Sequence, residues 1–340
     1  MADNREMLTN KIDTHLRTLL ADDQFSGVVL HAVRGEIVLK RGYGLANREL
    51  GLAHTPDTVF PIASLTKPFT ALALLILAAR KQVDLAERIR VYLPECPRHW
   101  DAITVHHLLS HTAGLPNVTA LPHLDLASIL PASHWALVDL VGASPLDFAP
   151  GTRWAYSNTG YLLLGALIER LADQPYAQFA EEEIFRPLQM RHTTCAPATT
   201  AAQYAFGYVQ SSDAITRAVA LDLSLCPAAG GIYSTANDLY RWFQHAAATL
   251  PVPPDLFAMM HEPRTPITSG QSEAYGYGWA IREAFGTRLT YHDGRLVGYK
   301  HCLGYLHDHQ TTTIVLSNDD WTTPCLIANA INAITFGGDE

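Results

Sequence analysis

Three short stretches of this 340-residue chain, far apart in sequence, carry side chains that could attack and activate a carbonyl group. In the first, Ser64 is followed by Lys67 where the turn signal Phe60-Pro61 gives way to a long apolar run. Residues three apart on a helix are neighbours, with about 5 to 6 Å between Cβ atoms, so the hydroxyl and the amine would face the same way. At a helix start the amide of Ser64 lacks an intrahelical partner and lies at the positive end of the helix dipole. The spacing is typical of an activated nucleophile, although a capping serine followed by a surface lysine has the same pattern.

The second stretch holds Tyr156 and Asn158 in a turn before another apolar run. A phenol with a pKa near 10 is a poor base unless a neighbouring cation stabilises its anion, and a lysine ammonium would do so. Asn158 offers an acceptor that could hold that lysine and a donor that could bind a substrate amide. By themselves these two residues are equally consistent with a packed aromatic side chain followed by a turn.

The third stretch is His292-Asp293-Gly294, where one late β-rich run approaches the next. The imidazole of His292 could assist proton transfer or bind a carboxylate. Gly294 would let a ligand come close to a strand edge. Alone, this pattern is most often the end of a strand and a turn.

Strands at both ends of the chain and helices between them must position these residues. Residues 26–44 predict a hairpin that turns at Arg34-Gly35, and three more β-rich runs precede a final helix from about Thr323 to Ile334. The apolar residues near the N-terminus recur at helical spacing and predict an amphipathic helix lying on the body of the protein.

The residues between these two ends have a mostly helical pattern, and there is no internal repeat or Gly/Ser linker. We therefore expect an α+β fold, in which an antiparallel sheet is flanked by helices and interrupted by an inserted helical region. The sheet with its terminal helices would comprise residues 1–63 and 201–340, the helical region residues 64–200, and the active site would lie at their junction.

The composition argues against several kinds of partner. The chain has 24 basic and 33 acidic side chains and a net charge of -9. Binding to nucleic acid or anionic lipid would require clustered Lys and Arg, which the sequence does not show. Its longest uncharged apolar run, Ala71 to Ala79, is well short of the roughly 20 residues of a membrane span. We therefore expect no nucleic-acid and no membrane partner.

The cysteines predict a reducing, cytoplasmic location. They are odd in number and show no C-x-x-C spacing, so they cannot pair fully, and they lie at Cys96, Cys195, Cys226, Cys302 and Cys325. The charged N-terminal segment also cannot be the apolar core of a secretory signal.

The three stretches occur in the order Ser-x-x-Lys, Tyr-x-Asn and basic residue-x-Gly, which is the order of the serine β-lactamase and penicillin-binding protein superfamily. The sequence resembles the branch that contains class C β-lactamases, D-aminopeptidases and related esterases. The likeness extends over most of the chain, roughly Ser26 to Asn318, through phrases such as ITVHHLLSHTAGLP, FAPGTRWAYSNTGYLLLGALIE, AAGGIYSTANDLYRW and YGYGW.

This resemblance implies a β-lactamase/DD-peptidase-like fold and a covalent mechanism. Ser64 would attack a carbonyl and become acylated, while Lys67 and Tyr156 would take its proton and return it to the leaving group. The backbone N–H groups of Ser64 and Arg295 would hold the negative oxygen of the tetrahedral intermediate. No cofactor and no metal ion is expected. The spacing of His106, His107 and His111 does not place them on one helix face, which argues against a metal site, and the resemblance makes them structural.

Two departures from the family pattern bear on the substrate. His292 stands where true β-lactamases and transpeptidases have a lysine, and resembles the His-x-Gly of D-aminopeptidases and several esterases, which argues against strong β-lactamase activity. Arg295 stands where the family commonly has a small residue. We hypothesise that its guanidinium pairs with an anionic group of the substrate, the alternative being an arginine turned out to solvent.

The leading hypothesis is therefore a serine hydrolase, an esterase or a D-amino-acid amidase or peptidase, that acts on a small-molecule ester, amide or peptide through an acyl-Ser64 intermediate. An acyltransferase of small-molecule biosynthesis remains an alternative, because an alcohol or amine could capture the acyl-enzyme in place of water. A non-catalytic penicillin-binding or sensor domain is a third possibility, which the intact motifs argue against.

Overall fold

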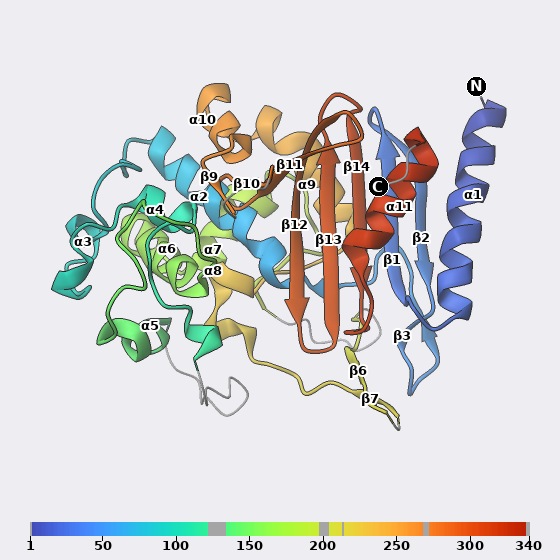
Figure 1. Ribbon diagram of the computed structural model, residues 1–340, viewed down its shortest axis with the longest axis horizontal. Coiled ribbons are helices and arrows are strands. Elements are labelled where there is room, and N and C mark those ends of the chain that lie inside the picture. Colours follow the sequence, from blue (N-terminus) through green and yellow to red (C-terminus); the bar gives the residue numbers. More distant parts are fainter. Residues whose placement is uncertain (1, 122–133, 197–203, 213, 268–271, 338–340) are drawn as a thin grey trace.

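An eight-stranded antiparallel sheet takes its strands from both ends of the chain (Figure 1). The computed structural model describes residues 2–121, 134–196, 204–212, 214–267 and 272–337. Strands β1 (Gly27–Val33) and β2 (Glu36–Tyr43) form the predicted hairpin. Arg34 and Gly35 both have positive φ, 51° and 79°, as a two-residue hairpin turn with the twist of its strands requires.

The remaining strands come from the last quarter of the chain. The spatial order is β2-β1-β14-β13-β12-β11-β10-β9, so the N-terminal hairpin pairs with the last strand. The bounds are β9 (Thr265–Pro266), β10 (Ala274–Tyr275), β11 (Ala280–Ala284), β12 (Thr287–Leu296), β13 (Tyr299–Leu306) and β14 (Thr311–Ser317). The residues between β13 and β14 are His307-Asp308-His309-Gln310, which form the tip of this hairpin.

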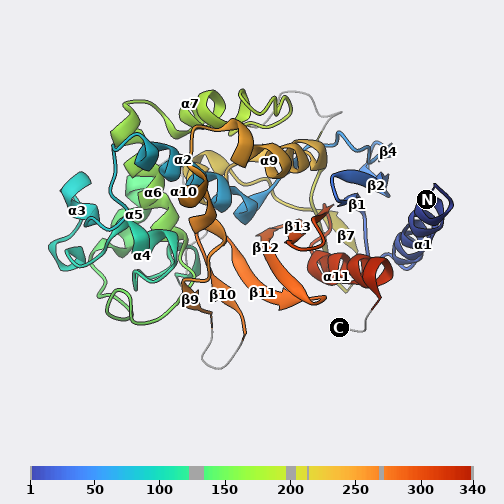
Figure 2. The same cartoon turned by 90° about the horizontal axis from the view of Figure 1, so that it is seen from above.

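Helices cover both faces of the sheet, as the view from above shows (Figure 2). Helices α1 (Ala2–Ala21) and α11 (Pro324–Phe336) pack on one face, and α9 (Ala236–Thr249) packs on the other. All seven residues of β14 are buried, and they alternate between the two core layers: Val315 contacts the α1 and α11 layer, whereas Ile314 and Leu316 belong to the main core. A central strand covered on both faces is expected to be buried along its whole length; in β14 the apolar residues are Ile314, Val315 and Leu316, and the buried Thr311, Thr312, Thr313 and Ser317 flank them.

The predicted helical region is present beside the sheet. Helix α2 (Lys67–Ala79) is buried along residues 67–77, so it is the central helix of this layer. It packs against α6 (Asn158–Ala172) and the short helix α8 (Pro227–Gly230). The other α-helices here are α3 (Ile89–Tyr92), α4 (Val105–Leu109), α5 (His134–Gly142), α7 (Tyr176–Ala180), which continues as the π-helical turn η4 (Glu181–Phe185), and α10 (Pro254–Ala258).

Short elements complete the described chain. The two-stranded ladders are β3 (Leu45–Asn47) with β4 (Leu52–Ala53), β5 (Phe60–Pro61) with β8 (Tyr233–Ser234), and β6 (Tyr208–Gln210) with β7 (Ile215–Arg217). The 3₁₀ turns are η1 (Ala63–Thr66), η2 (Arg98–Trp100), η3 (Val118–Ala120), η6 (Leu223–Leu225) and η7 (Met259–His261).

The predicted α+β class, antiparallel sheet and terminal helices are confirmed. Helices α8, α9 and α10 lie after residue 201, so the later segment contributes helices besides the terminal one. The domain boundaries at residues 63/64 and 200/201 stay a prediction. In the part of the chain that the structure describes, no helix combines the length and the apolar character that crossing a membrane takes.

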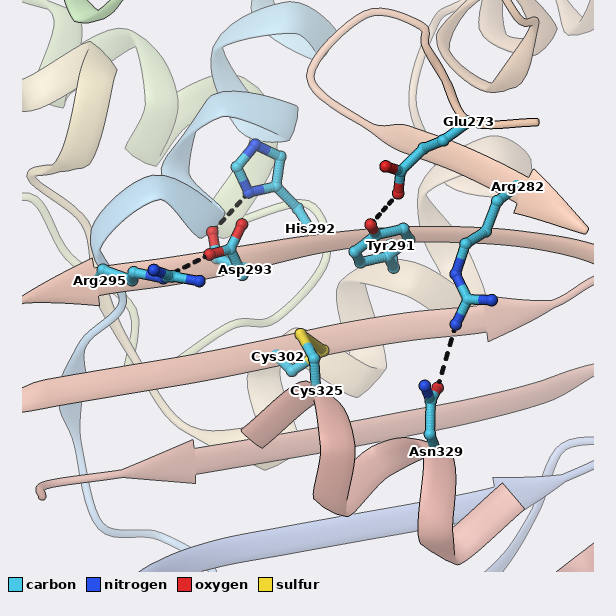
Figure 3. Close-up of a disulfide and its surroundings, with 9 residues drawn as sticks. All are labelled: Glu273, Arg282, Tyr291, His292, Asp293, Arg295, Cys302, Cys325 and Asn329. Atoms are coloured by element: carbon cyan, nitrogen blue, oxygen red, sulfur yellow. Dashed lines mark hydrogen bonds and ion pairs between the residues drawn. A yellow bond between two sulfur atoms is a disulfide. The ribbon is translucent and has the colours of Figure 1, made fainter. Parts of the chain in front are cut away.

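The cysteines differ from expectation. Cys302 on β13 and Cys325 at the start of α11 form a disulfide, with their Cα atoms 5.2 Å apart (Figure 3). The expectation of a reducing setting, in which these two cysteines would be thiols, is therefore not met by this pair. The physical reason is that Cys302 lies on the face of β13 that α11 covers, which brings two residues 23 apart within bonding distance. Cys96, Cys195 and Cys226 are free.

Candidate active site

Ser64 lies in the tight turn η1, directly between the short strand β5 and helix α2. Ala63, the residue before it, has φ of 50°, a left-handed conformation that is uncommon for residues with a side chain. Such conformations persist where the surrounding structure enforces them, often at functional sites. Pro68 follows at the start of α2, where its missing amide costs nothing because the first turn has no partners to lose.

The three side chains expected to act together meet around one oxygen. The hydroxyl of Tyr156 lies 2.6 Å from Ser64 Oγ, and Lys67 Nζ donates to the same oxygen at 3.2 Å. Tyr156 reaches this position from the loop just before α6, and Lys67 is the first residue of α2. The convergence that the sequence predicted is thus present in the structure.

Lys67 is completely buried and surrounded by acceptors and aromatic rings. Its amine donates to Asn158 Oδ1 at 2.8 Å and to the backbone carbonyl of Ala229 on α8 at 2.7 Å. It also lies over the rings of Tyr156 and Tyr161, at 4.7 and 5.3 Å from their centroids. Burial lowers the pKa of the Lys67 ammonium from 10.5 to about 7, because desolvation penalises the charged form. A substantial fraction of the amine is therefore neutral, and able to accept a proton, near neutral pH.

The pKa of Tyr156 shifts in the opposite direction from that of Lys67. Burial raises the pKa of its phenol well above the usual value, and the hydrogen bond with Ser64 only partly opposes that increase. The sequence analysis allowed for a phenolate stabilised by a lysine ammonium. In the folded protein Tyr156 keeps its proton, so Lys67 is the member of the pair whose protonation changes near neutral pH.

Asn158 begins α6 and is held on every side. Its backbone N–H donates to Asn117 Oδ1 at 3.0 Å, its Nδ2 donates to Thr119 Oγ1 at 2.8 Å, and its Oδ1 accepts from Lys67. Its side chain therefore has one fixed orientation, with the oxygen toward the lysine. This is the role in holding Lys67 that the sequence suggested for it.

His292 lies on β12 behind Tyr156, with 6.4 Å between the ring centroids, and its side chain is 4% exposed. Its Nδ1 is 2.6 Å from the carbonyl oxygen of Asp293 (Figure 3), and because a carbonyl can only accept, Nδ1 carries the hydrogen. Its Nε2 is 3.0 Å from the hydroxyl of Tyr275 on β10. Burial lowers the pKa of His292 to about 4, so the ring is neutral and Nε2 accepts from Tyr275. Both nitrogens are thus engaged away from Ser64.

Gly294 brings the edge of β12 against the nucleophile turn. A Cβ at this position would lie 2.6 Å from the carbonyl oxygen of Ile62, the residue at the start of η1. Any side chain at this position would push the backbone of β12 away from that of Ile62. Glycine is therefore required for β12 to approach Ser64.

Arg295 belongs to the same strand but its side chain lies on the other face. Its Nε donates to Asp293 Oδ2 at 2.9 Å, and its side chain is 77% exposed (Figure 3). The residue also lines the pocket beside Ser64. The hypothesis that it binds an anionic substrate group remains a prediction, with Asp293 as a competitor for the guanidinium.

A pocket of about 180 Å³ opens beside Ser64. Its wall is mostly apolar, formed by Val118, Leu162, Leu221, Leu223 and Leu296 together with alanine and glycine residues. Its polar groups are Thr119, Asn158, Asp222, Cys226 and Arg295. The dimensions and lining suit a compact apolar acyl group.

The histidines of residues 106–111 have separate partners. His106 Nδ1 is 2.8 Å from the hydroxyl of Tyr277, His107 takes part in the capping of α4, and His111 Nδ1 accepts from the backbone N–H of Ser157 at 3.3 Å. Within the described ranges, no three or more His, Cys, Asp and Glu side chains are grouped so that they could hold a metal ion.

Sequence reasoning missed two groups at this site. The Ala229 carbonyl that accepts from Lys67 has no side chain to signal it. Tyr275 lies in the segment YGYGW, which supported the resemblance without a role being assigned. The ring of His111, which was expected to be structural, packs against those of Tyr156 and Tyr275, with 4.5 and 4.8 Å between centroids.

Comparisons with known proteins agree on one family. The family model described as Beta-lactamase matches residues 12–333. Penicillin-binding protein 4* of Bacillus subtilis (strain 168) is 28% identical, over 96% of this chain and 76% of that protein. Esterase EstB of Burkholderia gladioli is 35% identical over 54% of this chain, and the alignment spans only 50% of the esterase.

The solved structures agree on the fold. The D-amino acid amidase from Ochrobactrum anthropi SV3, complexed with D-phenylalanine, superposes with a TM-score of 0.82 at 24% identity, covering 96% of both chains. This likeness confirms the fold that the motifs predicted.

Proposed function

The chain belongs to the beta-lactamase family of hydrolases, and from this we propose that it cleaves an ester or amide bond through an acyl-Ser64 intermediate. The observation that supports the proposal most directly is the position of Ser64 Oγ, 2.6 Å from the Tyr156 hydroxyl and 3.2 Å from Lys67 Nζ. A nucleophile within hydrogen-bond distance of its base, with the base held by further groups, is the arrangement of covalent catalysis.

In the acylation step, the neutral amine of Lys67 takes the proton of Ser64 as Oγ attacks the substrate carbonyl. The ammonium that forms is stabilised by Asn158 Oδ1 and the Ala229 carbonyl, which already lie at 2.8 and 2.7 Å. Tyr156 gives its phenolic proton to the leaving group and regains one from the lysine. The backbone N–H groups of Ser64 and Arg295 hold the negative oxygen of the tetrahedral intermediate. Attack by water then releases the acyl group.

The surroundings of Ser64 disfavour a substrate carboxylate next to His292. His292, which stands at the place of a lysine in true β-lactamases, is a buried neutral ring and offers no cation for a carboxylate. The pocket wall is mostly apolar. We propose an ester or a D-amino-acid amide or peptide as substrate, with weak turnover of β-lactams. An esterase and a D-amino acid amidase among the similar proteins are consistent with this class.

The cytoplasmic location stays a prediction. The Cys302–Cys325 disulfide weighs against it, since disulfides persist chiefly in oxidising compartments. Cell fractionation followed by immunoblotting would decide it.

Intact-mass analysis after exposure to a p-nitrophenyl ester and to a penicillin tests the proposed activity. We expect a covalent adduct on the wild-type protein with turnover of the ester, and neither on Ser64→Ala. An unmodified wild-type protein with no hydrolysis would support a non-catalytic sensor instead. Added alcohols and amines would reveal an acyltransferase, if transfer to them exceeds hydrolysis.

A further inference from the structure

Tyr156 lies in a segment that no helix or strand holds. Residues 153–157 precede α6 and belong to no regular element. Buried backbone groups need hydrogen-bond partners, and in such a segment the partners must come from other parts of the chain. The position of the Tyr156 hydroxyl, 2.6 Å from Ser64 Oγ, therefore depends on what holds the backbone on its two sides.

His111 bonds to the residue on each side of Tyr156. Its backbone carbonyl accepts from the N–H of Ala155 at 2.9 Å, and its Nδ1 accepts from the N–H of Ser157 at 3.3 Å. Its ring also packs on the ring of Tyr156, with 4.5 Å between the centroids. One residue thus holds the backbone before and after the tyrosine and contacts the side chain between them.

The bond from Ser157 fixes the protonation state of the His111 ring. A backbone N–H can only donate, so the Nδ1 that accepts from it carries no hydrogen. The ring is therefore neutral, with its hydrogen on Nε2. A second proton could only go to Nδ1, where it would remove the acceptor and break the bond to Ser157. The side chain is buried, and burial lowers the pKa of His111 well below its usual value, in agreement with this state.

His111 also occupies a backbone position that usually belongs to glycine. It follows the end of α4 with φ of 57°. The N–H of Thr112 donates to the His107 carbonyl at 2.8 Å, and the N–H of His111 donates to the Leu108 carbonyl at 3.4 Å. This is the Schellman arrangement of a helix C-terminus, in which the left-handed residue is usually glycine and sometimes asparagine. The backbone alone would favour glycine here, so the unfavourable φ of a histidine points to a role of its side chain.

We propose that His111 is a positioning residue, which places the Tyr156 hydroxyl at Ser64 by accepting hydrogen bonds from the backbone on both sides of the tyrosine. It acts through Tyr156 and not on the substrate. The kinetic consequence rests on the proposed function. The hydrogen bond from Ser157 to His111 is a property of the folded protein and is independent of that function.

Two substitutions separate the ring of His111 from its acceptor. His111→Phe keeps an aromatic ring and removes Nδ1, whereas His111→Asn removes the ring and keeps an acceptor, Oδ1, close to the place of Nδ1. Asparagine also tolerates the left-handed conformation. For a p-nitrophenyl ester we expect kcat of His111→Phe to fall about 10²-fold with KM unchanged, because a misplaced catalytic group loses alignment. We expect His111→Asn to recover about tenfold of that loss.

His31→Phe is the matched control, since it removes both nitrogens from another buried histidine. His31 lies on β1, which β14 and β13 separate from β12, and its nitrogens bond to Thr313 and Thr335. Near-ultraviolet CD confirms folding of each variant, and we expect folded His31→Phe to keep the wild-type kcat.

Two kinetic results would overturn the inference. The first is a fall in kcat for His31→Phe as large as that for His111→Phe, and the second is an equal kcat for the two His111 variants. In either case an acyl-Ser64 adduct in the mass spectrum of the wild-type protein would keep the proposed function.

The hydrogen bond itself is tested without measuring activity. ¹⁵N NMR of imidazole-labelled wild-type protein, with His111→Asn to assign the signal, should show Nε2 protonated and Nδ1 bare. Amide exchange of Ser157, followed by NMR, should be about tenfold faster in His111→Phe than in the wild type because the bond to Nδ1 is lost. An Nδ1–H tautomer in the wild type, or equal exchange in the two proteins, would refute the inference even if the enzyme proved inactive.

Discussion

Residues on the two faces of strand β12 lie in opposite environments, and this determines what each can do. His292 faces the nucleophile turn, is 4% exposed, and has a pKa lowered to about 4 by burial. Arg295 lies on the face where α11 packs, is 77% exposed, and pairs with Asp293. Successive side chains of a strand point to opposite faces, so a step of one residue leads from the buried ring of His292 to the exposed pair of Asp293 and Arg295.

The difference indicates where mutations should act. Side chains on the face toward η1 are buried, so we expect the loss of one of their contacts to lower the reaction rate strongly. An exposed ion pair contributes only about 0 to 1 kcal/mol to stability or binding, so its loss should have a small effect. Three substitutions test this contrast, in decreasing order of expected effect.

Lys67→Ala should have the largest effect. It removes the buried base, and loss of a positioned general base lowers rates by about 10²- to 10⁴-fold. In the wild type the neutral amine is the active form, so kcat/KM should rise with pH through about 7, the lowered pKa of Lys67. The variant should lose this dependence. Stopped-flow measurement of acylation from pH 5 to 9 gives both the rate and its pH dependence. Lys40→Ala, which removes an exposed lysine, is the control. A variant that retained the wild-type rate and profile would exclude Lys67 as the base.

Gly294→Ala should come next. The added methyl would lie 2.6 Å from the Ile62 carbonyl and push β12 away from the nucleophile turn. A displacement of this size costs about 10²-fold in rate through lost alignment. The control Gly142→Ala adds a methyl whose nearest neighbour is at 3.6 Å, an ordinary contact. Equal kcat/KM values for the two variants would contradict the tight approach of β12.

Arg295→Ala should have the smallest effect. If the guanidinium binds an anionic substrate group, KM for a carboxylate-bearing ester should rise up to about fivefold, as expected for an exposed ion pair, with no change for the neutral ester. Arg288→Ala removes an exposed arginine of the same strand and is the matched control. An unchanged KM for the anionic ester would exclude Arg295 from substrate binding.

Much of this arrangement was predictable from the sequence because it follows from local signals. Arg34-Gly35 specified the hairpin, helical spacing specified the terminal helices, and the order of the three motifs specified the meeting of Ser64, Lys67 and Tyr156. The first two depend on residue type and short-range spacing, whereas the third was predicted from the resemblance to a known family.

The remainder depends on tertiary packing. The Cys302–Cys325 pair requires the register of β13 beneath α11, which no cysteine spacing announces. The bond from Tyr275 to His292 requires β10 and β12 to lie in one sheet with β11 between them. The lowered pKa of Lys67 is caused by burial, and the Ser-x-x-Lys motif alone does not predict how deeply the lysine is buried.

The pairing of the first strand with the last has a consequence for biosynthesis. Gly27 on β1 lies opposite Ser317 on β14, so the N-terminal hairpin has no neighbour on that side until β14, some 290 residues later, has left the ribosome. Such long-range closure slows folding and leaves a strand edge exposed in the nascent chain. Because β12 belongs to the same late group of strands, a nascent chain that lacks β12 would hold Ser64 and Lys67 without the strand that completes their surroundings, and reactivity would begin only once β12 is in place.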